Sequence, residues 1–104
     1  MSAPADLREQ RALNMLRDAA RKLDMIQQRT DHQPTLVMAR RYRAKVRAHR
    51  ALILNTAHPA TRQGNAQISI ETFGPNGLAP AIDSLVVAAM QPRARASHVL
   101  ENAR

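Results

Sequence analysis

Seven basic or histidine side chains fall within eleven consecutive residues, Arg40 to Arg50, in the stretch "MARRYRAKVRAHRALIL". Arginine suits phosphate binding because its planar guanidinium donates paired hydrogen bonds to the oxygens of one group. No Asp or Glu occurs between Asp31 and Glu71, so this stretch contains no acid that could neutralise the charge. We expect six of these cations to contact nucleic-acid phosphates: Arg40, Arg41, Arg43, Lys45, Arg47 and Arg50.

The geometry of these cations follows if the stretch is helical. At roughly 100° per residue, one row of the helix carries Arg40, Arg43, Arg47 and Arg50, while Arg41 and Lys45 lie on the other flank. The side that would pack carries Met38, Tyr42, Val46 and Ile53. An alternative interpretation is a solvated face whose arginines pair with acids of a neighbouring helix: Glu9, Asp18 and Asp24.

The composition also limits the kind of nucleic acid. Phosphate contacts carry no base information, so binding should show little sequence preference. Single strands are bound by stacking on aromatic side chains, and the chain has one Tyr, one Phe and no Trp. We therefore expect duplex DNA or structured RNA as the partner.

No other residues form a catalytic or metal-binding pattern. The four histidines lack ligand spacing, and His49 is expected to be a hydrogen-bonded residue of the packing stripe. No serine lies in a nucleophile motif, the glycines form no phosphate loop, and cysteine is absent. We predict a non-enzyme with no cofactor, no metal and no small-molecule substrate.

Overall composition indicates one small, basic domain with little material for a core. The 104 residues carry a net charge of +8, with 16 Lys and Arg against 8 Asp and Glu. A GC-rich coding sequence would explain the preference for Arg over Lys, but it does not explain the net excess. Because large apolar side chains are few, we expect part of the core to be completed by a homodimer mate or by a larger protein assembly.

Apolar periodicity predicts a mainly α fold within a single domain spanning 1–104. An antiparallel helical hairpin should occupy about 6–29 and 34–55, with a capping box at Asp6 and Glu9 opening its first helix. A loop over 56–65, one short strand over 66–72 and an apolar helix over 79–90 should follow. A short basic helix or tail should end the chain.

The predicted strand alternates apolar and polar residues in "AQISIETF". A lone strand needs a partner for its backbone groups, so Ile68 and Ile70 are candidates for self-association or for pairing with a partner's strand. "QISIETF", "LAPAIDSLVVAAM" and "RASHVLENA" resemble the strand and helices of ribbon–helix–helix repressors. That resemblance would direct Gln67, Ser69 and Glu71 toward DNA bases, but it covers only the C-terminal part of the chain.

These observations lead to one functional hypothesis and one alternative. The first is a small basic accessory protein, of phage or plasmid type, that binds nucleic acid through an Arg-rich helix. The alternative is an adaptor, inhibitor or virion-type structural subunit that docks on a larger assembly. The N-terminus lacks an apolar leader core, and "LVVAAM" is too short to span a bilayer. We therefore expect a cytoplasmic protein, or one enclosed in a particle assembled in the cytoplasm, without membrane partners.

Overall fold

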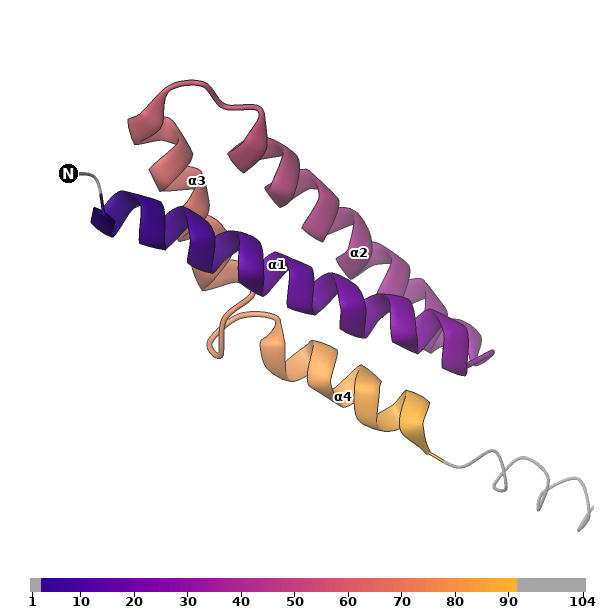
Figure 1. Cartoon of the computed structure of the whole chain (residues 1–104). Coiled ribbons are helices and arrows are strands. Elements are labelled where there is room, and N and C mark those ends of the chain that lie inside the picture. The colour runs from indigo at the N-terminus through magenta and orange to yellow at the C-terminus, as the bar shows by residue number, and fades with distance from the viewer. Residues whose placement is uncertain (1–2, 92–104) are drawn as a thin grey trace, which may run out of the picture.

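Helix α1 (Ala3–Arg29) is the element on which the rest of the chain packs. The computed structural model describes residues 3–91, with side chains from residue 7 onward, and Figure 1 shows its helices. The predicted stripe of α1 is entirely buried: Ala12, Leu16, Ala19, Leu23 and Ile26. The spacing of four and three residues that marked this stripe therefore identified the core face correctly.

The predicted capping box at Asp6 is wrong, because α1 already begins at Ala3. Glu9 instead accepts a hydrogen bond from Arg62 Nε of α3 at 2.9 Å. The acid therefore ties two helices together rather than opening one.

Helix α2 (Gln33–Leu54) runs back along α1 after a three-residue connection (Figure 1). Pro34 lies in its first turn, where a missing backbone N–H costs no hydrogen bond. His32 stabilises this start: its backbone N–H donates to Thr30 Oγ1 at 3.1 Å, and its Nδ1 lies 2.9 Å from Thr35 Oγ1. Five residues of α2 are buried: Thr35, Leu36, Ala39, Val46 and Ile53.

The predicted strand over 66–72 and most of the predicted loop over 56–65 are wrong. Both fall in helix α3 (Pro59–Thr72), and no strand occurs within residues 3–91. Ala66, Ser69 and Phe73 are buried at spacings of three and four, so the packing against α1 and α2 follows the helical period. The short alternation around Ile68 satisfied a strand pattern equally well, and tertiary burial decided between the two.

Loss of the strand also removes the proposed strand pairing. Ile70 packs against the core of its own chain, while Ile68 is 54% exposed on the helix surface. The implied ribbon of the ribbon–helix–helix resemblance is likewise absent from the described residues. Self-association by another surface stays a prediction.

Helix α4 (Ala79–Met90) matches the predicted apolar helix over 79–90. It packs mainly on α1, burying Ile82 and Ala89, and Lys22 Nζ of α1 forms an ion pair with Asp83 Oδ1 at 2.9 Å. Helices α3 and α4 do not pack on each other. They follow one another along the α1–α2 pair, like a third helix of a bundle that is interrupted at residues 73–78. The predicted basic helix or tail lies outside the described residues.

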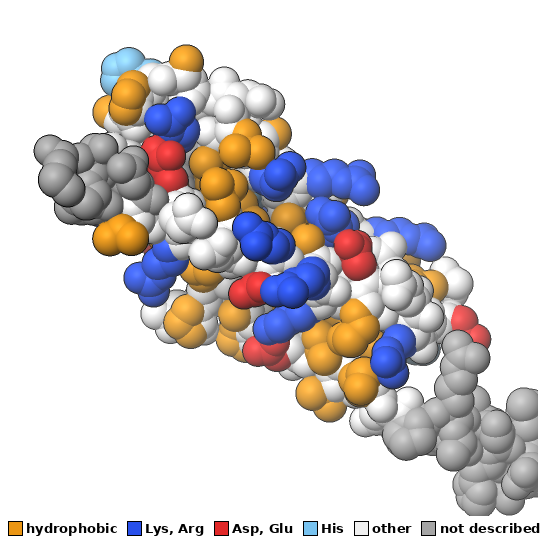
Figure 2. Space-filling view, viewed as in Figure 1, with side chains coloured by type: hydrophobic (Ala, Val, Ile, Leu, Met, Phe, Trp, Pro, Cys, Tyr) orange, Lys and Arg blue, Asp and Glu red, His pale blue; other side chains and the backbone are white. Residues whose placement is uncertain are grey.

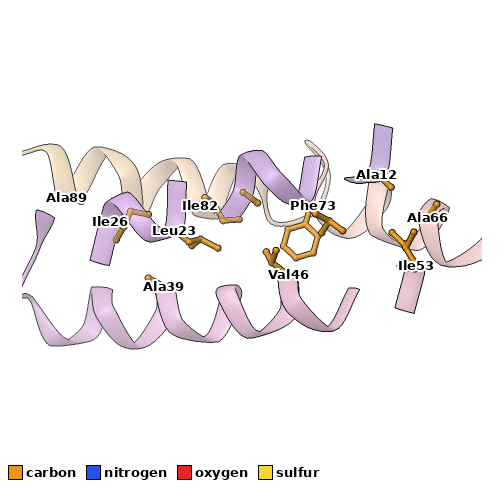
Figure 3. Close-up of a cluster of buried hydrophobic side chains, with 12 residues drawn as sticks. Ala12, Leu23, Ile26, Ala39, Val46, Ile53, Ala66, Phe73, Ile82 and Ala89 are labelled. Carbon is orange, nitrogen blue, oxygen red and sulfur yellow. The ribbon is translucent and has the colours of Figure 1, made fainter. Parts of the chain in front are cut away.

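The core is a narrow row of side chains between these helices, as Figure 3 shows. Phe73 is its one aromatic residue and is 4% exposed. The rest is aliphatic or Ala, in agreement with the scarcity of large apolar residues in the sequence. None of the helices in the described part is long and apolar enough to cross a membrane.

The turn between α3 and α4 depends on close backbone packing at Gly77. Its N–H donates to the Gly74 carbonyl at 3.0 Å, and a Cβ at Gly77 would collide with the carbonyl oxygens of Glu71 and Thr72. A Cβ at Gly64, inside α3, would meet nothing within 4 Å.

We expect Gly77→Ala to lower the free energy of unfolding by about 1–3 kcal/mol, since rigid backbone must move. The matched control Gly64→Ala should raise that free energy by roughly 0.5–1 kcal/mol through helix propensity. Urea denaturation followed by circular dichroism measures both. Equal effects of the two variants would contradict the turn geometry.

Candidate polyanion-binding furrow

A furrow of about 700 Å³ runs between α1 and α2, and none of its lining residues comes from α3 or α4. We call it the α1–α2 furrow. One wall is formed by Leu13, Arg17 and Ala20 of α1. The other wall and the floor are formed by Arg43, Val46, Arg47, Arg50, Ala51, Leu54 and Asn55.

One ion pair marks the register of the two helices. Arg43 Nε donates to Asp24 Oδ1 at 3.0 Å. Arg17 precedes Asp24 by seven residues and Arg50 follows Arg43 by seven, which is two helical turns in each direction. In an antiparallel pair these two displacements are equal, so Arg17 and Arg50 line the furrow from opposite walls. Two like charges therefore line the furrow at the same level along the helix pair.

The structure separates the six predicted cations into groups. Arg47 and Arg50 are exposed and line the furrow, and Arg40 lines a smaller hollow of about 210 Å³ next to it. Arg43 is partly buried and engaged by Asp24. Two further cations are exposed on the other flank of α2, as the wheel predicted, and line neither hollow: Arg41 and Lys45.

Arg17 is the furrow cation that the sequence did not predict. It lies off the apolar stripe of α1, beside Leu13 and Ala20, and nothing in its local pattern marks it. Its only signal is the spacing to Asp24, which becomes informative once the Asp24–Arg43 pair is known.

Of the three acids that could neutralise this face, only Asp24 pairs with α2, through Arg43. Asp18 pairs with Arg21 at 2.6 Å within α1, and Glu9 pairs with Arg62 at 2.9 Å. The interpretation of a self-neutralised face therefore applies to Arg43 alone. Arg17, Arg47 and Arg50 form no ion pair with any acid among residues 7–91. Figure 2 shows many basic side chains on the face that carries α1, with apolar side chains and several acidic ones among them.

His49 forms a polar seam on the opposite side of α2, against α3. Its Nδ1 lies 2.8 Å from Ser69 Oγ, and its ring meets Phe73 edge-on with centroids 5.3 Å apart. Burial, and secondarily the positive charge of Lys45, lower the pKa of His49 from its ordinary 6.5. Ser69 is 1% exposed, so its hydroxyl lies inside the fold, and the pair joins two helices.

Comparison with protein-family models, with curated proteins and with solved structures finds no match to this chain. Within the described residues, no three His, Asp or Glu side chains gather where they could hold a metal ion. The residues of the furrow and of the His49 seam are therefore the basis for the functional inference.

The lowered pKa of His49 predicts a specific pH dependence of stability. Above about pH 6.5 the ring is neutral in both states and its contribution is complete. As the pH falls, the unfolded chain takes up the proton first, so the free energy of unfolding decreases until the folded pKa is reached. This contribution has a slope of at most about 1.4 kcal/mol per pH unit.

Urea denaturation between about pH 5 and pH 7.5 measures that slope. His49→Gln, which keeps a polar side chain but cannot titrate, should flatten the curve relative to wild type. His58→Gln is the control, because His58 is exposed and makes no side-chain cap hydrogen bond at the start of α3. Identical curves for all three proteins would show that the His49 seam does not control the acid response.

Proposed function

We propose that the protein is a non-enzymatic nucleic-acid-binding module that contacts phosphates through the α1–α2 furrow and the exposed arginines beside it. The observation that carries this proposal is that Arg17, Arg47 and Arg50 line one furrow from two helices, with no acid among the described residues paired to them. Guanidinium groups in such an arrangement present several donors to one strand of phosphates.

The length of the arginine row fits a short piece of backbone. Arg40 and Arg50 are ten residues apart on α2, which is about 15 Å at 1.5 Å rise per residue. That distance corresponds to a few consecutive phosphates. Arg43 contributes less directly, since Asp24 already occupies its guanidinium Nε. Arg41 and Lys45 would assist from the other flank by long-range attraction.

Small side chains favour close approach on the outer side of α2. Ala44, Ala48 and Ala51 are exposed, and they lie between the furrow arginines and the Arg41/Lys45 flank. A helix surface of this kind lets a phosphate ribbon come near without steric hindrance. The proposed contacts are to phosphates, which carry no base information, so we expect no direct base readout.

The double variant R47Q/R50Q should weaken binding to duplex DNA by about tenfold per lost contact near 0.1 M salt, equally on all sequences. It should also reduce the slope of log affinity against log salt by about 1 for each contact. Fluorescence anisotropy with labelled random duplexes over a salt series measures both quantities.

A matched control is the double variant R11Q/R29Q. Both residues are exposed on α1 and line neither hollow, and the change in net charge is the same. General charge attraction alone would reduce affinity equally in the two double variants. The proposal requires the furrow variant to lose clearly more.

A second candidate function is an adaptor or structural subunit, and the floor of the furrow favours it. Leu54 is 51% exposed there, beside Leu13 and Ala51. A phosphate group gains no binding energy from this exposed apolar surface. An acidic amphipathic helix of a partner protein would cover the apolar side chains and pair with the arginines. Self-association and docking on a larger assembly belong to this candidate.

Leu54→Gln separates the two candidates. It should leave nucleic-acid affinity unchanged, because charge is preserved, but it should weaken a protein partner that buries this side chain. Affinity purification from the native source with and without nuclease, repeated with L54Q, provides the comparison. A defined protein that is retained at high salt after nuclease treatment, and lost with L54Q, would favour the adaptor.

A further inference from the structure

The α1–α2 furrow is lined by like charges from two helices. Arg17 lines one wall and Arg50 the other, with Arg47 one turn away on α2. Opposite charges at such positions attract and like charges repel. Asp24 and Arg43 form an attractive pair of this kind at 3.0 Å, two turns further along. At the level of Arg17 and Arg50, the furrow therefore has cations on both walls and no acidic side chain in its lining.

The neighbouring side chains cannot relieve this repulsion. Leu13, Ala20, Val46 and Ala51 are apolar, and the one other polar group of the lining is the amide of Asn55. The alanines leave space between the walls. An oxyanion fits this arrangement, because its oxygens accept hydrogen bonds in several directions at once and its charge offsets both walls.

We propose that the furrow holds a phosphate group between the two helices, with Arg17 on one wall and Arg47 and Arg50 on the other, and that this phosphate stabilises the packing of α1 on α2. The inference rests on the same furrow as the proposed function and adds a residue and a coupling to it. The phosphate belongs to a nucleic-acid backbone or to a free phosphate compound, which share this chemistry.

The coupling follows from the position of the ligand. A phosphate that touches both helices binds the folded chain and not the unfolded one, so it raises the melting temperature by mass action. The cations of the Arg41/Lys45 flank both lie on α2 and line neither hollow. Anions that gather there lack this bridging contact.

Thermal unfolding of the full chain, followed by circular dichroism, tests the inference. Inorganic phosphate is titrated against chloride at matched ionic strength, for wild type, R17Q and R11Q. Arg11 is the control because it is exposed on the same helix, lies outside the furrow and carries the same charge. Wild type and R11Q should gain several degrees in phosphate beyond chloride.

R17Q should behave differently in two ways. Without phosphate and at low salt, it should melt at a higher temperature than R11Q, since the repulsion with Arg50 is removed. With phosphate, its specific gain should be lost. As an independent measurement, the side-chain Nε–Hε NMR signals of Arg17, Arg47 and Arg50 should shift at the same phosphate concentration in wild type. Equal phosphate gains in all three proteins, or shifts confined to other arginines, would overturn the inference.

A second arm identifies the source of the phosphate and separates this inference from the proposed function. In this arm, binding of a short DNA duplex is measured for R17Q and R11Q and in competition with inorganic phosphate. If phosphate competes with the duplex and R17Q binds it at least tenfold more weakly than R11Q, the nucleic-acid backbone is the source of the phosphate. If phosphate stabilises the fold only when Arg17 is present, while duplex affinity is the same without Arg17, the phosphate site is supported. The proposed nucleic-acid-binding function at this furrow is then rejected. Stabilisation by an acidic amphipathic peptide that depends on Leu54, without any Arg17-dependent phosphate effect, overturns the inference in favour of the adaptor.

Discussion

The buried stripe of α1 is the constraint on which the structure depends. Helices α2, α3 and α4 each pack on α1, and α3 and α4 make no contact with one another. Leu16, Leu23 and Ile26 are fully buried and supply much of the volume of a core that contains one aromatic ring. Because burial of apolar area is the main stabilising contribution in so small a domain, this one face determines where every other helix can lie.

The position of α2 on that face determines the electrostatics. Once Val46 and Ile53 are buried against α1, helical geometry directs the arginine row to the edge of the interface. The Asp24–Arg43 pair lies at this edge, with both side chains partly solvated, so its own contribution to stability is small. It serves as a geometric marker, because it shows which α1 residue lies level with Arg50. The same packing that forms the core therefore produces the cationic furrow.

The opposite side of α2 has a different character. His49 and Ser69 satisfy each other inside the α2–α3 contact, and no buried side-chain polar atom in the described region lacks a hydrogen-bond partner. Phe73 packs edge-on against the same ring. A hydrogen-bonded polar pair in a thin core favours one alignment of α3 over its alternatives, since sliding the helix would leave a hydroxyl or a ring nitrogen unpaired. The two sides of α2 thus serve different purposes, with structure on one and exposed charge on the other.

The sequence by itself determined the mainly α class, the buried stripe of α1, the extents of α2 and α4 to within a residue or so, and the cation-rich surface of α2. These features depend on periodicity over long segments and on Pro breaks, which are local signals. The tertiary structure alone decided that 59–72 is a helix, because the short alternation around Ile68 fits two periods and only burial of Ala66, Ser69 and Phe73 selects one. It also decided that Arg43 is paired and that Arg17 lines the same furrow as Arg50, because such neighbours depend on the register between two helices, which neither helix encodes on its own.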